Sequence, residues 1–148
     1  MNYWFECKVS YERQADSMGM KKVSESYLVD ALSFTEAEKR IIKEVRPFVS
    51  VGELEVVNIR RARIAELFLN DDAEDDRYFR AKVNFITVDE KSGSEKKTSA
   101  TMIVKSDSLP NAVTKLKAQL DSQMASYEIA AVTDTQILDV FQYEAPEK

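Results

Sequence analysis

The residues best suited to recognition chemistry are two aromatic side chains, each followed four residues later by a lysine. Trp4 precedes Lys8 in the stretch WFECKVSY, and Tyr78 precedes Lys82 in the stretch YFRAKVNF, with Arg80 between them. An aromatic ring beside a cation on an open sheet stacks an unpaired base and holds the neighbouring phosphate. The spacing therefore predicts a surface that binds single-stranded DNA or RNA.

A second group of cations lies in the run NIRRARI, which contains Arg60, Arg61 and Arg63. In the second half of the chain the aligned residues are threonine, aspartate and glutamine, so the fold does not require arginine at these positions. The net charge of −5 disfavours polyanions as partners. We therefore expect the three arginines to supply a local positive surface that assists the lysines in contacting phosphates.

The same side chains also allow a second interpretation, a contact between proteins. Trp4 and Tyr78 would then cover a core between the two halves of the chain or lie in a subunit interface, where aromatic residues and arginine are enriched. Lysine and arginine on strands also keep the edge of a sheet soluble. The sequence thus leaves a homo-oligomer or a protein partner open as the alternative to nucleic acid.

The residue types needed for most catalytic and metal sites are missing. The chain has no histidine and one cysteine, so it cannot build a zinc site or a Ser-His or Cys-His catalytic pair. Its three glycines form neither of the glycine-rich loops that hold nucleotide phosphates. The acidic run at 70–76 departs from a calcium-binding loop, which would need an oxygen ligand at Ala73 and a glycine at Asp76. We expect a non-enzymatic protein without a cofactor or a metal.

The single cysteine, Cys7, excludes an internal disulfide and indicates a reducing, cytoplasmic setting. Cys7 falls on the apolar face of its strand and its second-half counterpart is Ala81, so we expect a small buried side chain rather than a reactive thiol. The stretch MNYWFECK lacks the basic start and apolar run of a secretory signal. No stretch of about eighteen residues is apolar throughout, and no membrane partner is expected.

The elements that must position these residues occur twice in the chain. Residues 3–11, 33–45 and 54–70 align with 77–85, 108–120 and 127–143, at offsets of 74, 75 and 73 residues. Since the offset drifts by only one residue at a time, each drift can be placed in a turn. This pattern predicts an internal duplication.

Each half alternates or repeats its apolar residues in the order strand, strand, helix, strand, strand. Phe5, Cys7 and Val9 alternate with polar residues as in a half-buried strand, and Ala37 and Ile41 form the apolar stripe of a helix with Ser33 or Thr35 as its N-cap. The predicted strands are 3–11, 22–31, 54–60 and 63–69 around a helix at 33–45, then 78–85, 98–105, 127–133 and 136–143 around a helix at 108–120.

The predicted fold class is α+β, with two fused ββαββ repeats related by pseudo-twofold symmetry and one helix packed on an antiparallel sheet in each half. We expect one compact domain over 1–148, with repeat 1 at about 3–70, repeat 2 at about 77–144 and an acidic connection at 70–76. The order is similar to that of Whirly and Pur-type single-strand nucleic-acid binders, an analogy of topology alone.

Three stretches carry a resemblance to a known family: W-F-E-C-K-V-x-Y-E, V-S-E-S-Y-L-V-D-A-L-S-F-T-E-A-E and I-R-R-A-R-I-A-E-L-F. Together they resemble an uncharacterised domain family of gut anaerobes and their phages, over nearly the whole chain. The resemblance implies no activity and no site residues. A phage or mobile-element context would favour transactions on DNA.

Overall fold

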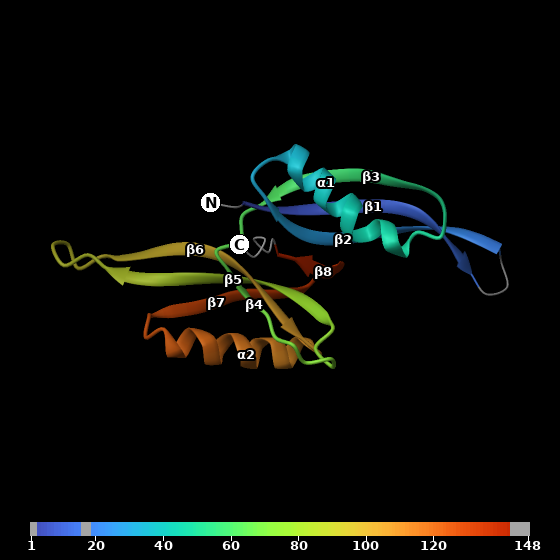
Figure 1. Cartoon of the computed structure of the whole chain (residues 1–148). Coiled ribbons are helices and arrows are strands. Elements are labelled where there is room, and N and C mark those ends of the chain that lie inside the picture. Colours follow the sequence, from blue (N-terminus) through green and yellow to red (C-terminus); the bar gives the residue numbers. More distant parts are fainter. Residues whose placement is uncertain (1–2, 16–18, 143–148) are drawn as a thin grey trace, which may run out of the picture. The chain divides into compact units, whose positions relative to one another are not determined.

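The computed structural model describes residues 3–15 and 19–142. The first-half elements are β1 (Tyr3–Ala15), β2 (Gly19–Ala31), α1 (Phe34–Val45), the 3-10 helix η1 (Arg46–Phe48), β3 (Val51–Ala62) and β4 (Glu66–Phe68). The second-half elements are β5 (Arg77–Val88), β6 (Glu95–Ser106), α2 (Leu109–Ser122), β7 (Tyr127–Asp134) and β8 (Ile137–Phe141). This order, visible in Figure 1, confirms the predicted α+β class and the ββαββ arrangement of each half.

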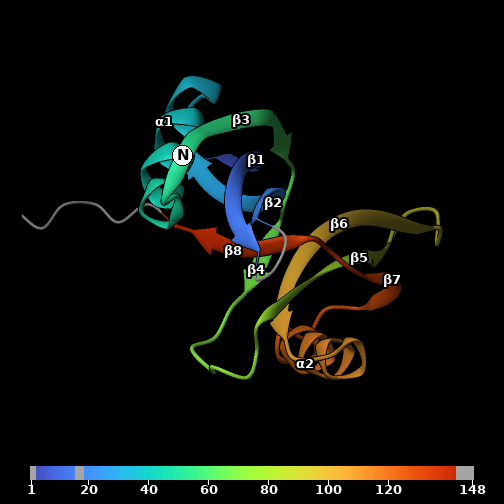
Figure 2. The ribbon, with the colours of Figure 1, turned by 90° about the vertical axis from the view of Figure 1, so that its right-hand side faces the viewer.

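The chain folds into two compact units, each with its own sheet and helix. Unit 1 contains residues 1–63 and 136–148, and unit 2 contains residues 64–135. The sheet of unit 1 has the strand order β3-β1-β2-β8, and that of unit 2 has the order β4-β6-β5-β7. Helix α1 covers one face of the first sheet and α2 covers one face of the second (Figure 2).

The two halves of the sequence exchange their last strands. Strand β4, from the first half, pairs with β6 of unit 2, and β8, from the second half, pairs with β2 of unit 1. Both of these pairings are parallel, whereas the other three strands of each sheet pair antiparallel. The fully antiparallel sheets predicted from the sequence are therefore wrong at one edge. Strand β4 does not turn back onto β3 but continues to the edge of β6, and β8 does the same at the edge of β2.

The two units share one irregularity of strand pairing, although unit 1 has a second one, between Ser10 and Glu12, that unit 2 lacks. In unit 1 the pairing of β1 with β3 slips after Lys8, which leaves Val57 as the extra residue of a β-bulge. In unit 2 the pairing of β5 with β7 slips after Lys82, which leaves Ala130 as the extra residue. Lys8 and Lys82, like Val57 and Ala130, are the pairs that the sequence offsets align. Such matching bulges are what an internal duplication predicts.

Both helices begin with the same serine cap. The Ser33 hydroxyl accepts a hydrogen bond from the backbone N–H of Glu36 at 3.2 Å, and the Ser108 hydroxyl accepts one from Asn111 N–H at 3.3 Å. Each bond satisfies one of the N–H groups that a helix leaves open at its start. Of the two N-caps predicted for the first helix, Ser33 is therefore correct.

Each unit buries a cluster of apolar side chains between its helix and its sheet. In unit 1, Phe5, Cys7 and Val9 of β1 lie beneath Ala37 and Ile41 of α1, all at most 2% exposed. In unit 2, Phe79, Ala81, Val83, Ala112 and Leu116 form the matching set. Burying each of the larger side chains contributes roughly 1.5–3 kcal/mol, so these clusters hold helix and sheet together.

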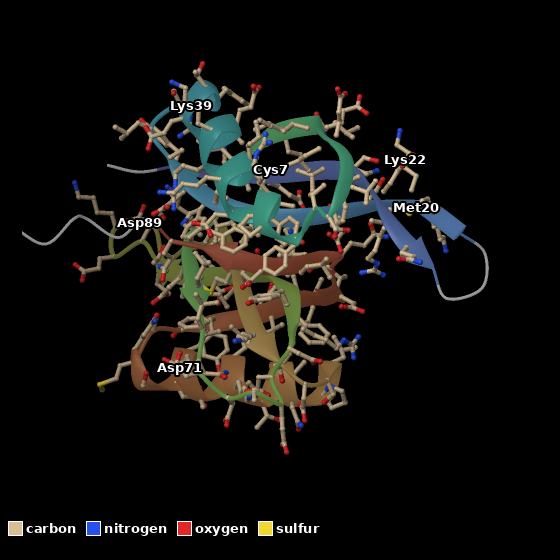
Figure 3. The ribbon with its side chains drawn as sticks, turned by 45° about the vertical axis from the view of Figure 1, so that its right-hand side comes forward. Cys7, Met20, Lys22, Lys39, Asp71 and Asp89 are labelled. Atoms are coloured by element: carbon tan, nitrogen blue, oxygen red, sulfur yellow. The ribbon has the colours of Figure 1, made fainter. Side chains whose placement is uncertain are left out.

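The acidic segment at 70–76 lies within unit 2, between β4 and β5. Asp71 is on the loop after β4 (Figure 3) and is exposed, as expected for a solvated connection. Asp75 differs, because it is only 5% exposed and forms an ion pair with Lys115 of α2. This segment therefore ties a loop to a helix of one unit and does not separate the units.

Across the described residues, no helix is both long enough and apolar enough to cross a membrane. The longer α-helix of these residues, α2, has 14 residues and includes the charged Lys115, Lys117 and Asp121.

The strand exchange predicts that Phe141 stabilises the unit formed mainly by the other half of the sequence. Phe141 stacks on Tyr27, with ring centroids 5.5 Å apart, and packs against the cluster of unit 1. Phe141→Ala should cost about 2 kcal/mol, below the usual loss for phenylalanine because the ring is half-buried. Hydrogen exchange should accelerate in β2 and α1 and leave α2 unchanged.

Phe68→Ala is the matched control for this test, since Phe68 packs against the cluster of unit 2. It should accelerate exchange in β6 and α2 and spare α1. Faster exchange of α2 in the Phe141 variant, with β2 unaffected, would contradict the exchanged arrangement.

Candidate functional site

Trp4 and Tyr78 lie on the sheet face opposite the helix, because their neighbours Phe5 and Phe79 are buried beneath α1 and α2. Trp4 is half-buried, but Tyr78 is only 5% exposed. The expectation that both rings are open to solvent is therefore wrong for Tyr78. Ile103, on the adjacent strand and the same face, is fully buried too, so this end of the sheet is apolar on both faces.

The two lysines that follow these rings are exposed. Lys8 stands between Ser26 and Asn58 in the sheet of unit 1, and Lys82 stands between two small residues of unit 2. Both point away from the helix, as the alternation of their strands predicts. Arg80, two residues before Lys82 on the same face, is partly buried and engaged by other groups of the protein.

The three arginines of the run NIRRARI do not form one patch. Arg60 donates a hydrogen bond from Nε to Glu6 Oε2 at 2.6 Å, on the face opposite the helix. Arg61 is on the other face, where its guanidinium lies 3.9 Å from the centre of the Tyr3 ring. Arg63 is exposed at the end of the first chain segment of unit 1. Alternation along β3 thus divides neighbouring arginines between two faces.

The eight residues predicted to bind nucleic acid therefore fall into two groups. Unit 1 contains Trp4, Lys8, Arg60, Arg61 and Arg63, and unit 2 contains Tyr78, Arg80 and Lys82. Within unit 1, Trp4, Lys8 and Arg60 share a face, with the carboxylate of Glu6 among them. The local surface is mixed in charge and is less basic than the sequence predicts.

Cys7 is fully buried between β1 and α1 (Figure 3). Burial, together with the smaller effect of the nearby charge of Glu6, raises the pKa of its thiol from 9.0 to about 12. A thiol in this state is protonated and inaccessible, so it packs as a small apolar side chain.

Sequence reasoning missed a surface of unit 1 on which apolar side chains are exposed. Phe34, Phe48, Val51 and Val57 are exposed by 53%, 70%, 54% and 50%. Phe34 begins α1, Phe48 ends η1, and Val51 and Val57 belong to β3, which contacts α1; we call these four residues the β3 seam. A solvent-facing group of this kind is unusual for a surface that has no partner.

Two shallow hollows follow the β3 seam. One, of about 360 Å³, is lined by Phe34, Thr35 and Glu38 of α1 and by residues 56–59 of β3. The other, of about 380 Å³, is lined by Arg46 and Val49 near η1 and by residues 52–54 of β3. Phe34 and Val57 line the first hollow, and Phe48 and Val51 are next in sequence to Val49 and Gly52 of the second.

The other edge of the unit 1 sheet carries a larger and more charged hollow of about 550 Å³. It is lined by Glu36, Arg40, Lys43 and Glu44 of α1 and by residues 140–142 of β8 and its end. Arg40 is held there by an ion pair with Asp30. Because both signs of charge alternate around this hollow, it favours no particular class of ligand.

A comparison of the two halves is the signal that could have revealed the β3 seam. Between the aligned segments, the first half reads RPFVSVGE and the second half reads DSQMAS. Val57 aligns with Ala130, and Phe34 aligns with Leu109. Since unit 2 folds without them, the larger apolar residues are not required by the fold, and their exposure needs another explanation.

No group of three or more cysteine or acidic side chains that could hold a metal ion occurs among residues 3–15 and 19–142. In the loop before β5, Asp75 pairs with Lys115, and the backbone N–H of Asp72 donates a hydrogen bond to the Asn70 side chain at 2.9 Å.

The fold and surfaces define an α+β protein of two helix-covered, four-stranded sheets, each completed by an edge strand from the other half of the sequence. Residues 3–143 match the family model described as a domain of unknown function (DUF4494), and the chain belongs to this family. The chain matches no curated protein and no solved structure.

The burial of Cys7 predicts a thiol that does not react in the folded protein. With its pKa raised from 9.0 to about 12, the thiolate fraction near pH 8 falls roughly a thousandfold below that of an ordinary cysteine. Maleimide labelling at pH 8 should therefore be negligible in the native protein and complete in denaturant.

Cys7→Ala serves as the blank in this experiment, and it should fold because Ala81 fills the equivalent position in unit 2. Labelling of the native protein at the rate of a free thiol would show that the β1–α1 contact opens readily.

Proposed function

We propose that this protein is a non-catalytic binding protein that docks another protein chain along the β3 seam of unit 1. The observation that carries the proposal is the exposure of Phe34, Phe48, Val51 and Val57 at one edge of a sheet. Exposed apolar groups of this kind mark interaction surfaces, and aromatic residues dominate the energy of such contacts.

The chemistry of the seam supports docking over catalysis. Its hollows are shallow, and each combines apolar side chains with charged ones, Glu38 in the first and Arg46 and Glu53 in the second. Histidine is absent, and the one cysteine is buried away from these hollows. An extended segment could lie along β3 and place apolar side chains in both hollows, a frequent mode of recognition at sheet edges. The sole, buried cysteine suits a reducing cytoplasm.

Replacement of Phe34 tests the docking proposal. Phe34 packs edge-on against Phe5, with centroids 4.9 Å apart, and exposes the rest of its ring to solvent. Phe34→Ala should weaken the complex by about 1–2 kcal/mol, roughly tenfold or more in affinity, as measured by titration of the captured partner. Leu109→Ala, the matched change on unit 2, should leave the affinity unchanged.

The partner is captured with a photo-crosslinking residue, benzoylphenylalanine, placed at Val57 of the full chain in its native host. The same residue at Ala130, the matched and exposed position of unit 2, provides the control. Crosslinked product at Val57 in clear excess over Ala130 supports docking at the seam. Equal product at both positions, or none at either, refutes it.

Binding of single-stranded nucleic acid is the second candidate function. It is favoured by the exposure of Lys8 and Lys82 at matching positions and by the partial exposure of Trp4 beside Lys8. The phage context implied by the sequence resemblance would suit this function. The carboxylate of Glu6 beside Trp4 and the net charge of −5 oppose it, so any affinity should be modest.

Titration of labelled oligonucleotides at two salt concentrations tests this candidate. Micromolar affinity that falls steeply with salt is expected if phosphates are contacted. The double variant Lys8→Ala, Lys82→Ala should then lose at least about tenfold in affinity, while Lys39→Ala, Lys117→Ala, which removes the same charge from the helices, should not. Lack of binding at low salt would eliminate nucleic acid as the ligand.

A further inference from the structure

The position of β3 at the edge of its sheet leaves one side of this strand open. Strand β3 pairs with β1 on one side and has no strand neighbour on the other among the described residues. With 12 residues it is longer than the other three edge strands, β8, β4 and β7, which have 5, 3 and 8. A long open edge offers unpaired backbone N–H and C=O groups to another strand.

The charges of β3 change sign halfway along the strand. The first half contains Glu53 and Glu55, and the second half contains Arg60 and Arg61, followed by Arg63. Charged side chains and β-bulges often protect an edge strand against association, and β3 has both. Here an antiparallel copy would bring the acidic half of one strand against the basic half of the other.

We propose that two copies of this protein associate through antiparallel pairing of their β3 strands, which forms one continuous sheet across a twofold axis. The inference rests on the proposed docking function of the β3 seam and names its partner as a second copy of the chain. An isologous contact of this kind is the commonest geometry of protein dimers.

The bulge at Val57 sets the register of this pairing. Residues directly opposite one another in a sheet point to the same face. Because the bulge adds one residue, Glu55 and Asn58 lie on the same face of β3, opposite the face of Val56 and Ile59. When two antiparallel copies pair, opposite residues must point to the same face of the joined sheet. This holds on both sides of the twofold axis only when the two bulges meet at the centre.

In this register Glu55 lies opposite Asn58 of the second copy, and Glu53, within a second irregularity of β3 between Val51 and Glu55, falls near its Arg60. On the helix-covered face, Leu54 lies opposite Ile59, both partly buried and packed on the core of their own unit. The half-exposed Val57 of each copy lies opposite Val56 of the other, so the two Val57 residues are diagonal neighbours on either side of the axis. The contact therefore combines backbone pairing, apolar contact on one face and ion pairs on the other.

Two ion pairs within the chain use residues of this contact, but their side chains remain exposed enough to reach a second copy. Glu55 is 3.8 Å from Lys22, and both side chains are about two-thirds exposed. Arg60 contacts Glu6, yet 60% of the Arg60 side chain remains exposed. A guanidinium presents five N–H donors, so Arg60 can bind Glu6 and a second carboxylate together.

Unit 2 lacks this self-complementarity. The equivalent strand, β7, carries Glu128 near one end and Asp134 at the other, with no basic residue between them. Antiparallel pairing of two β7 strands would place like charges together. The sign change therefore distinguishes β3 from a strand that has the same place in the same topology.

Sedimentation velocity of the full chain over a range of concentrations tests the association. A species of twice the 16.9 kDa chain mass is expected at high concentration. A protein that stays monomeric at several hundred micromolar would overturn the proposal. If the protein is monomeric but Val57 crosslinks to a different protein, docking at the seam is still supported. If the protein is monomeric and Val57 gives no crosslink, both the dimer and the docking function are refuted.

Reciprocal charge reversal tests the pairing itself. The variant Glu53→Arg, Glu55→Arg and the variant Arg60→Glu, Arg61→Glu should each raise the dissociation constant of the dimer at least about tenfold, because like charges then face each other. An equimolar mixture of the two should restore a dimer, which also shows that both variants fold. The control Lys96→Glu, Lys117→Glu alters exposed charges of unit 2 and should have no effect. A dimer insensitive to either reversal would exclude β3 as its interface.

The register is tested by Val57→Cys, since the buried Cys7 does not compete for oxidation. Mild oxidation should link two copies through position 57, because the bulges meet within disulfide reach. Ala130→Cys is the matched control and should remain unlinked. Equal linkage of both variants would contradict the assigned register.

Discussion

Packing of one short helix onto the apolar face of one sheet is the interaction on which each unit depends. Helix α1 has 12 residues, a length at which an isolated helix is marginal in water. Its stripe of Ala37, Ile41 and Val45 is completely buried against β1 and its neighbours. The alternation of β1 supplies the other side of this contact, and it leaves the opposite face of the strand free to carry charged residues.

The exchange of edge strands adds a second constraint, which links the two units through covalent structure. The sheet of unit 1 is complete only when β8 has been added, and β8 is the last strand of the chain. The sheet of unit 2 likewise requires β4, which comes directly after the arginine-rich strand. Neither half of the sequence can therefore form its four-stranded sheet alone, although each provides a complete helix and three strands of one sheet.

Periodicity predicted the elements well, because alternation and helical stripes reflect burial beneath a nearby helix. Cys7 and Ala81 were correctly placed beneath the helices from their position on the apolar side of a strand. The exchange of β4 and β8 was not predicted, since Glu66 to Phe68 and Asp139 to Phe141 have equivalent patterns and fit either sheet. Only the geometry of the connection decides which open edge each strand reaches.

The candidate site was harder to predict, because alternation specifies a face and does not reveal what covers it. Tyr78 occupies the face that the sequence indicated, yet it is buried with Ile103 on that face. Arg60 and Arg61 are adjacent in sequence and therefore point to opposite faces of β3, where they contact Glu6 and Tyr3. A count of nearby cations overestimates a positive surface whenever the cations lie on a strand.

Differences between equivalent positions carry more functional information than the positions themselves. Two units of one topology share the requirements of folding, such as the serine caps, the buried faces and the central bulges. A residue that one unit has and the other lacks is therefore not required for folding. Two differences are of this kind: unit 1 has Val57 where unit 2 has Ala130, and the charge of β3 changes sign whereas that of β7 is acidic throughout. In unit 1 both features fall on the same open edge of the sheet. That coincidence is the reason we propose this edge as the place where the chain meets another.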